Sequence, residues 1–209
     1  MSAHARVVAE GYLRFVAAGR RHERASRAPA ARRPGELAAP ILVAPEKLSE
    51  LLRIAVREAC GLAEQGDELE VIWTRGDSEL AIDLREPTAV LGEGLLAVRL
   101  PVRCDQARGQ VTVPFAVGSE KAPAGLFAAT LRRPLGPLPV VAAWGDAVLA
   151  FAWSALLHLV TGLSGAAGRD ERGELLVPVE LSASKQRLMV APMARHRLPD
   201  ARSADTRGR

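Results

Sequence analysis

The stretch VVAAWGDAVLAFAWSALLHLVTGL, residues 140–163, decides the fold of this chain. From Ala147 onward it is apolar on nearly every side of a helix, and such a helix is buried on more than one side. A membrane span needs about 20 uncharged residues, but only 17 residues separate Asp146 from Ser164. Three of those 17 are polar: Ser154, His158 and Thr161. The sequence therefore favours a core helix, one that also offers contact to a partner, over a pure interface helix or a membrane span.

A second, amphipathic helix is predicted at residues 46–64. Pro45 suits the first helical turn, and Gly66 is the expected stop. The apolar residues recur every three or four positions, so they line one face: Leu48, Leu51, Leu52, Ala55, Val56, Ala59 and Leu62. We expect this face to be buried.

From residue 68 onward, apolar and polar residues alternate, which is typical of strands. One predicted hairpin joins residues 69–75 to 79–84 around Gly76-Asp77-Ser78. A second hairpin pairs the alternating runs 97–104 and 110–117, with Val102 opposite Val111 and a loop at residues 105–108. Further strands are expected at residues 126–132, 175–181 and 188–193.

Prolines interrupt several of these strands, at Pro101, Pro114, Pro178 and Pro192. A proline cannot donate to the strand ladder, so such strands lie at edges or carry bulges. We therefore predict an α+β fold: an antiparallel, proline-interrupted sheet of about five to seven strands packed against two helices. Its exposed edges are places where another chain, or a second copy, adds a strand.

Charge divides the chain into three parts. Residues 1–36 carry a balance of +5, residues 185–209 also carry +5, and residues 37–184 carry −6. We expect a basic arm and linker at 1–40, with a short amphipathic helix over 4–24, and a disordered basic tail at 196–209. The span 41–195 is predicted to be a single globular α+β domain, because about 150 residues suffice for one core.

Ser154 and His158 form the strongest catalytic candidate, because they stand four residues apart on the apolar helix. A serine nucleophile needs a base within hydrogen-bond reach and a third group that orients the base. Asp146 lies two turns before Ser154 and cannot reach His158 on the same helix, and no G-x-S-x-G turn presents the serine. We therefore predict no catalytic residue, and a buried helix whose polar atoms bond to backbone carbonyls.

Metal and cofactor sites are not expected either. The glycine runs at 92–94 and 162–168 do not match a phosphate loop, and the second suits a helix terminator. Cys60 and Cys104 fall on apolar faces of predicted elements, which indicates buried, reduced thiols. The RGDS sequence at 75–78 suits a tight turn rather than an adhesion motif. The histidines are scattered and form no ligand cluster: His4, His22, His158 and His196.

These observations favour a non-enzymatic binding or assembly protein that works within a larger protein complex. We expect it to be cytoplasmic, because Glu10, Gly11 and Arg14 interrupt any secretory apolar run. Two alternatives stay open: a hydrolase whose site only the fold assembles, and non-specific nucleic-acid binding through the basic tails. A protein partner or self-association is expected, and no stable membrane span.

Overall fold

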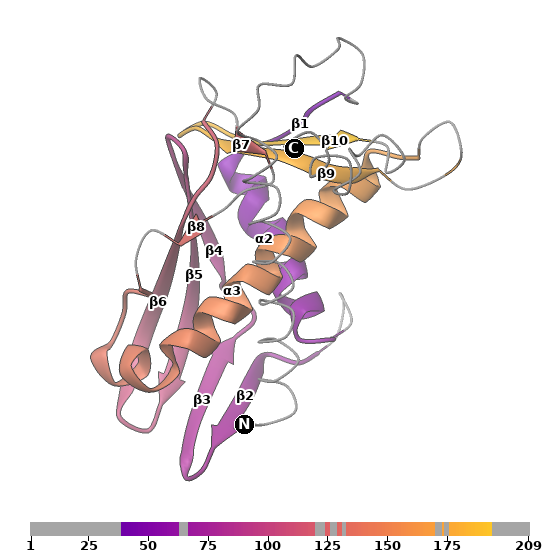
Figure 1. Cartoon of the computed structure of the whole chain (residues 1–209). Helices are drawn as coiled ribbons and strands as arrows, with labels where there is room; N and C mark the ends of the chain where they lie inside the picture. Colours follow the sequence, from indigo (N-terminus) through magenta and orange to yellow (C-terminus); the bar gives the residue numbers. More distant parts are fainter. Residues whose placement is uncertain are drawn as a thin grey trace, which may run out of the picture.

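The computed structural model describes residues 39–62, 67–119, 124–125, 129–130, 133–169, 173 and 176–193. Within this part the predicted α+β fold is confirmed: two antiparallel sheets lie against two helices (Figure 1). The helices are α2 (Pro45–Ala59) and α3 (Leu138–Ala166). The basic arm and the basic tail predicted from the sequence lie outside the described residues.

The larger sheet has the order β2-β3-β5-β6-β8, and β4 pairs with β5 beside this path. β5 is central: β6 pairs along its whole length, while β3 and β4 share its other edge, at residues 102–104 and 95–99 of β5. The strands are β2 (Glu70–Arg75), β3 (Ser78–Asp83), β4 (Thr88–Gly92), β5 (Leu95–Cys104), β6 (Ala107–Ala116) and β8 (Ala129–Thr130).

The smaller sheet has the order β1-β10-β9-β7. Its strands are β1 (Ile41–Val43), β7 (Ala124–Gly125), β9 (Val177–Ala183) and β10 (Leu188–Met193). A register shift between Ala191 and Pro192 places Pro192 opposite Pro178, so two of the interrupting prolines meet at one irregularity, as expected. For Pro101 and Pro114 the expectation of an edge or a bulge is wrong, because β5 and β6 lie inside the larger sheet and pair without a shift. Pro101 falls between the stretches of β5 that pair with β4 and with β3. We expected one sheet, and the structure has two. The alternating patterns predicted most of these strands but did not show which of them pair.

α3 runs diagonally between the two sheets, and α2 packs beside it (Figure 1). Phe151 and Leu156 of α3 are at most 1% exposed. The rings of Phe151 and of Trp73 on β2 meet edge to face with their centroids 5.2 Å apart, and those of Trp153 and of Phe115 on β6 do so at 4.6 Å. These contacts tie the helix to the larger sheet at two places. α3 is therefore the shared centre of the core, as the apolar run at 140–163 predicted.

α3 is the one described helix that is long and apolar enough to cross a membrane. More than half of its most apolar window is buried inside the fold. The helix begins at Leu138 and ends at Ala166, so it passes through Gly162, and the expected terminator at 162–168 acts only at its far end, where Gly168 has a φ of +116°.

The second hairpin has a different register from the predicted one. Leu100, not Val102, lies opposite Val111, and Val102 lies opposite Gly109. The loop is the two-residue turn at 105–106 rather than residues 105–108. A shift of two residues leaves every side chain on its predicted face, because strand side chains have a period of two. The shorter turn extends the ladder, which adds backbone hydrogen bonds.

α2 is shorter than the predicted helix at 46–64. It ends at Ala59, and Gly61 follows with a φ of +72°, a conformation that glycine adopts without a steric cost. The stop signal was therefore Gly61 rather than Gly66. The buried residues Leu48, Leu52 and Val56 confirm the predicted apolar face.

Candidate interaction surface at the edge of the larger sheet

β2 lies at the edge of the larger sheet, and in the described part of the chain it pairs only with β3. The register places Arg75 opposite Ser78 and Trp73 opposite Leu80. The Leu84 N–H donates to the Leu69 carbonyl at 2.9 Å, which identifies the odd-numbered residues of β2 as those bonded to β3. The N–H and C=O groups of Glu70, Ile72 and Thr74 therefore point away from β3. We call these groups the β2 edge.

Apolar side chains are exposed beside the β2 edge. Leu69 is 55% exposed and Ile72 is 53% exposed, whereas Trp73, the next residue, is 2% exposed. Because successive strand side chains point to opposite faces, Trp73 enters the core and Ile72 lies on the outer face. The result is a strand that buries Trp73 in the core and leaves Ile72 and its outward edge exposed.

The two ends of β2 are held by contacts to the helices. At the start, buried Arg57 of α2 donates to the Glu68 carbonyl and to the Glu68 carboxylate, both at 2.7 Å. At the end, the Arg75 guanidinium lies 5.1 Å from the ring centre of Trp144 on α3, a cation–π contact. A strand anchored in this way loses little conformational freedom when a partner pairs with it.

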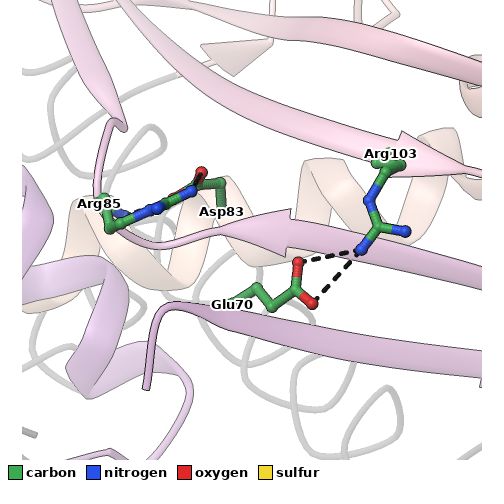
Figure 2. A network of polar contacts seen from close by, with 4 residues as sticks. All are labelled: Glu70, Asp83, Arg85 and Arg103. Atoms are coloured by element: carbon green, nitrogen blue, oxygen red, sulfur yellow. Dashed lines mark hydrogen bonds and ion pairs between the residues drawn. The ribbon is translucent and has the colours of Figure 1, made fainter. Parts of the chain in front are cut away.

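A polar network covers the outer face next to the β2 edge (Figure 2). Glu70 and Asp83 stand directly opposite each other on β2 and β3, and like charges in such positions repel. Arg103 of β5 donates to Glu70 at 3.2 Å, and Arg85 donates to Asp83 through Nε at 3.0 Å and through its terminal nitrogen at 2.5 Å. The Arg85 side chain holds the pKa of Asp83 below its ordinary value. Each carboxylate thus has its own arginine.

The edge of β4 offers a contrast, because α2 covers it. The Ala89 N–H donates to the Ser49 hydroxyl of α2 at 3.3 Å. All five residues of β4 are half-buried. The β2 edge has no such cover among the described residues, and β1, the edge of the smaller sheet, is only three residues long.

The catalytic candidates from the sequence are brought together only in part. Asp146 lies on the same helix two turns before Ser154, as expected, and its side chain is exposed. His158 instead meets Glu58 of α2, with 3.4 Å between Nδ1 and Oε2, and both side chains are more than 40% exposed. In the described part of the chain, no hydrogen bond joins Ser154 to His158. The pair His158–Glu58 is a surface contact between two helices, and nothing in the order of residues along either helix showed that it would form.

The other motifs have structural roles. Gly94 has a φ of +64° in the turn between β4 and β5, and its N–H donates to the Ala183 carbonyl at 2.9 Å, which links the two sheets. The RGDS sequence spans the β2–β3 turn, where Arg75 is engaged by Trp144. Burial raises the pKa of the Cys60 thiol to about 12, whereas Cys104 is half-buried. No group of three or more metal-binding side chains occurs among the described residues.

His4, His22 and His196 lie outside the described residues, and so do both basic segments that motivated nucleic-acid binding. No family model, no curated protein and no solved structure matches this chain. The candidate site therefore rests on the geometry of the β2 edge. The sequence signalled the strand and its turn, but not that the strand would have only one neighbour.

Proposed function

We propose that this chain is a non-enzymatic binding or assembly protein whose partner adds a strand at the β2 edge. The observation that carries the proposal is the set of outward backbone groups on Glu70, Ile72 and Thr74 beside the exposed Ile72 side chain. In strand addition, main-chain hydrogen bonds supply affinity, and the alternate side chains supply specificity. β2 provides both in a strand of six residues.

β2 also lacks most of the devices that keep sheet edges from pairing. Such devices are prolines, bulges, charged side chains (above all lysine) and very short strands. β2 has two charged side chains, and both make contacts within the chain: Glu70 with Arg103 and Arg75 with Trp144. β2 contains no proline and no lysine, and its register with β3 runs without a shift from Glu70 to Arg75. The prolines of the larger sheet stand instead on β5 and β6, at Pro101 and Pro114, inside the sheet. The open edge is therefore a feature that a partner strand would use.

The test uses a matched pair at Thr74, whose N–H points away from β3. Thr74→Pro removes that N–H without removing a bond to β3, and Thr74→Ser keeps both the backbone N–H and a side-chain hydroxyl. We expect Thr74→Ser to associate like the wild type and Thr74→Pro to lose at least tenfold in affinity. Light scattering, native mass spectrometry and affinity recovery from lysate measure this association, and thermal melts confirm that both variants fold.

Two outcomes contradict the proposal. A wild-type chain that is strictly monomeric and recovers no protein removes the basis for an assembly role. If a folded Thr74→Pro variant associates as tightly as the wild type, the partner binds at a place other than the β2 edge.

A hydrolase is the second candidate, and the contact between His158 and Glu58 favours it. A carboxylate on Nδ1 orients a histidine so that Nε2 is available as a base, and Ser154 stands one turn before His158. Two observations argue against a hydrolase: the three side chains lie at a surface, and Ser154 donates no hydrogen bond to His158 or Glu58 in the described part of the chain. Labelling by a fluorophosphonate probe, compared between the wild type and Ser154→Ala, decides the question. Labelling that disappears in Ser154→Ala supports a hydrolase, and equal labelling excludes Ser154 as its nucleophile.

A further inference from the structure

We infer that the partner strand at the β2 edge is β2 of a second copy of this chain, paired antiparallel about a two-fold axis at Ile72. This inference rests on the proposed function and deepens it, because it names the partner and the register. The observations that carry it are the positions of the outward backbone groups and the order of side chains along β2.

The backbone fixes the register. Three residues of β2 point outward, and Ile72 is the middle one. When two such strands run antiparallel with Ile72 opposite Ile72 of the second copy, Glu70 falls opposite Thr74 in both directions. Each of these three pairs then exchanges two hydrogen bonds, as in the hydrogen-bonded pairs of an antiparallel ladder. All outward N–H and C=O groups from Glu70 to Thr74 are satisfied, and no shifted register satisfies as many.

The side chains are self-complementary in this register. Ile72, which is 53% exposed in one chain, packs against its own copy at the axis. The Glu70 carboxylate faces the Thr74 hydroxyl, which donates a hydrogen bond to it, so no like charges stand opposite each other. On the inner face, Val71 falls opposite Trp73 of the copy. A partner of unrelated sequence would need to match this pattern, and a second copy matches it by symmetry.

The arrangement is a closed dimer. Residues directly opposite each other in an antiparallel pair share one face of the sheet, so the two larger sheets join into one continuous sheet with the helices of both copies on the same side. One strand pair is a small contact compared with the roughly 1,200–2,000 Å² that specific interfaces usually bury. We therefore expect a reversible dimer that forms at micromolar or higher concentration, rather than an obligate one.

Cysteine substitution tests both the partner and the register with the full chain. In the proposed register the two copies of residue 72 have Cα atoms about 5.5 Å apart, within the range that a disulfide spans. Ile72→Cys alone should form a covalent dimer under mild oxidation. Glu70→Cys and Thr74→Cys should each form no disulfide-linked dimer alone, because like positions lie roughly 14 Å apart, but a mixture of the two should form a mixed covalent dimer. The wild type, with Cys60 buried and Cys104 half-buried, is the control.

Analytical ultracentrifugation of the unsubstituted chain across a concentration series gives an independent readout. A concentration-dependent dimer, together with the mixed disulfide between the Glu70→Cys and Thr74→Cys variants, supports the inference. A monomer at every concentration without disulfides overturns it, and so does a dimer in which Glu70→Cys links to itself as readily as to Thr74→Cys. If the chain is monomeric but Thr74→Pro still loses a recovered protein, self-pairing fails and the proposed function stands. If neither association occurs, both fail.

Discussion

Leu156→Ala is the sharpest test of the α3 assignment, because Leu156 is only 1% exposed at the middle of that helix. The substitution removes three carbon groups, and at about 0.8 kcal/mol for each buried group the lost transfer free energy is about 2.4 kcal/mol. A cavity between α3 and its neighbours adds to this, so we expect a loss of about 3–4 kcal/mol in the free energy of unfolding, within the range of about 2–5 for such changes.

Leu157→Ala is the matched control, since the neighbouring Leu157 is half-buried. Because the side chain at the half-buried position already lies partly in water, Leu157→Ala should lose only about half as much, roughly 1–2 kcal/mol. Urea melts of the two variants, read from the transition midpoints at equal slopes, measure the difference. The reasoning is refuted if the two variants are equally stable, or if the protein requires detergent, since a membrane helix would barely respond to either change.

Three further outcomes follow from individual contacts. Gly136→Ala should destabilise the fold, because the new Cβ would lie 2.9 Å from the Gln110 carbonyl oxygen. Gly162→Ala, inside α3, should stabilise the fold by about 0.5–1 kcal/mol, because the new Cβ would meet no atom within 4 Å beyond the neighbouring backbone of its own helix. Thermal melts compare the two variants. Because the folded pKa of Asp83 lies below its unfolded value, its contribution to stability is present above about pH 4 and is lost as the pH falls through the folded pKa. Arg85→Ala should therefore flatten the acid side of a stability–pH curve, and an unchanged curve would contradict the contact. With a pKa of about 12, Cys60 should resist iodoacetamide at about pH 8 in the folded protein and react after denaturation; fast labelling of Cys60 in the folded state would disprove its burial.

The larger sheet was predictable where alternation is long. β5 and β6 each have ten residues, and apolar side chains stand at every second position over Leu96–Cys104 and Val111–Phe115; this pattern placed both apolar rows on one face. β1 and β4 were not predicted. β1 has only three residues, too few to show a period. β4 is half-buried throughout, because α2 covers its edge, so its residues show no clean alternation.

The candidate site was less predictable than the fold, because it depends on which strands have only one neighbour. The sequence placed a strand and a turn at residues 69–78, but the openness of the β2 edge follows from β3 taking the other side and from α2 covering β4 instead. The same holds for His158. Its partner, Glu58, lies 100 residues away along the chain and approaches only when α2 packs on α3.

The pairing of β1 with β10 has a consequence for how this chain folds. Ile41 lies opposite Val190, so the first and last strands of the described core are neighbours (Figure 1). Closing so long a loop costs entropy before any bond is gained, which places this step late on a folding pathway. β1 is also short and contributes few bonds, so its amides should exchange with solvent sooner than those of β5. β1 would then join the smaller sheet last and leave it first, while the β9–β10 hairpin, α3 and the larger sheet keep their structure.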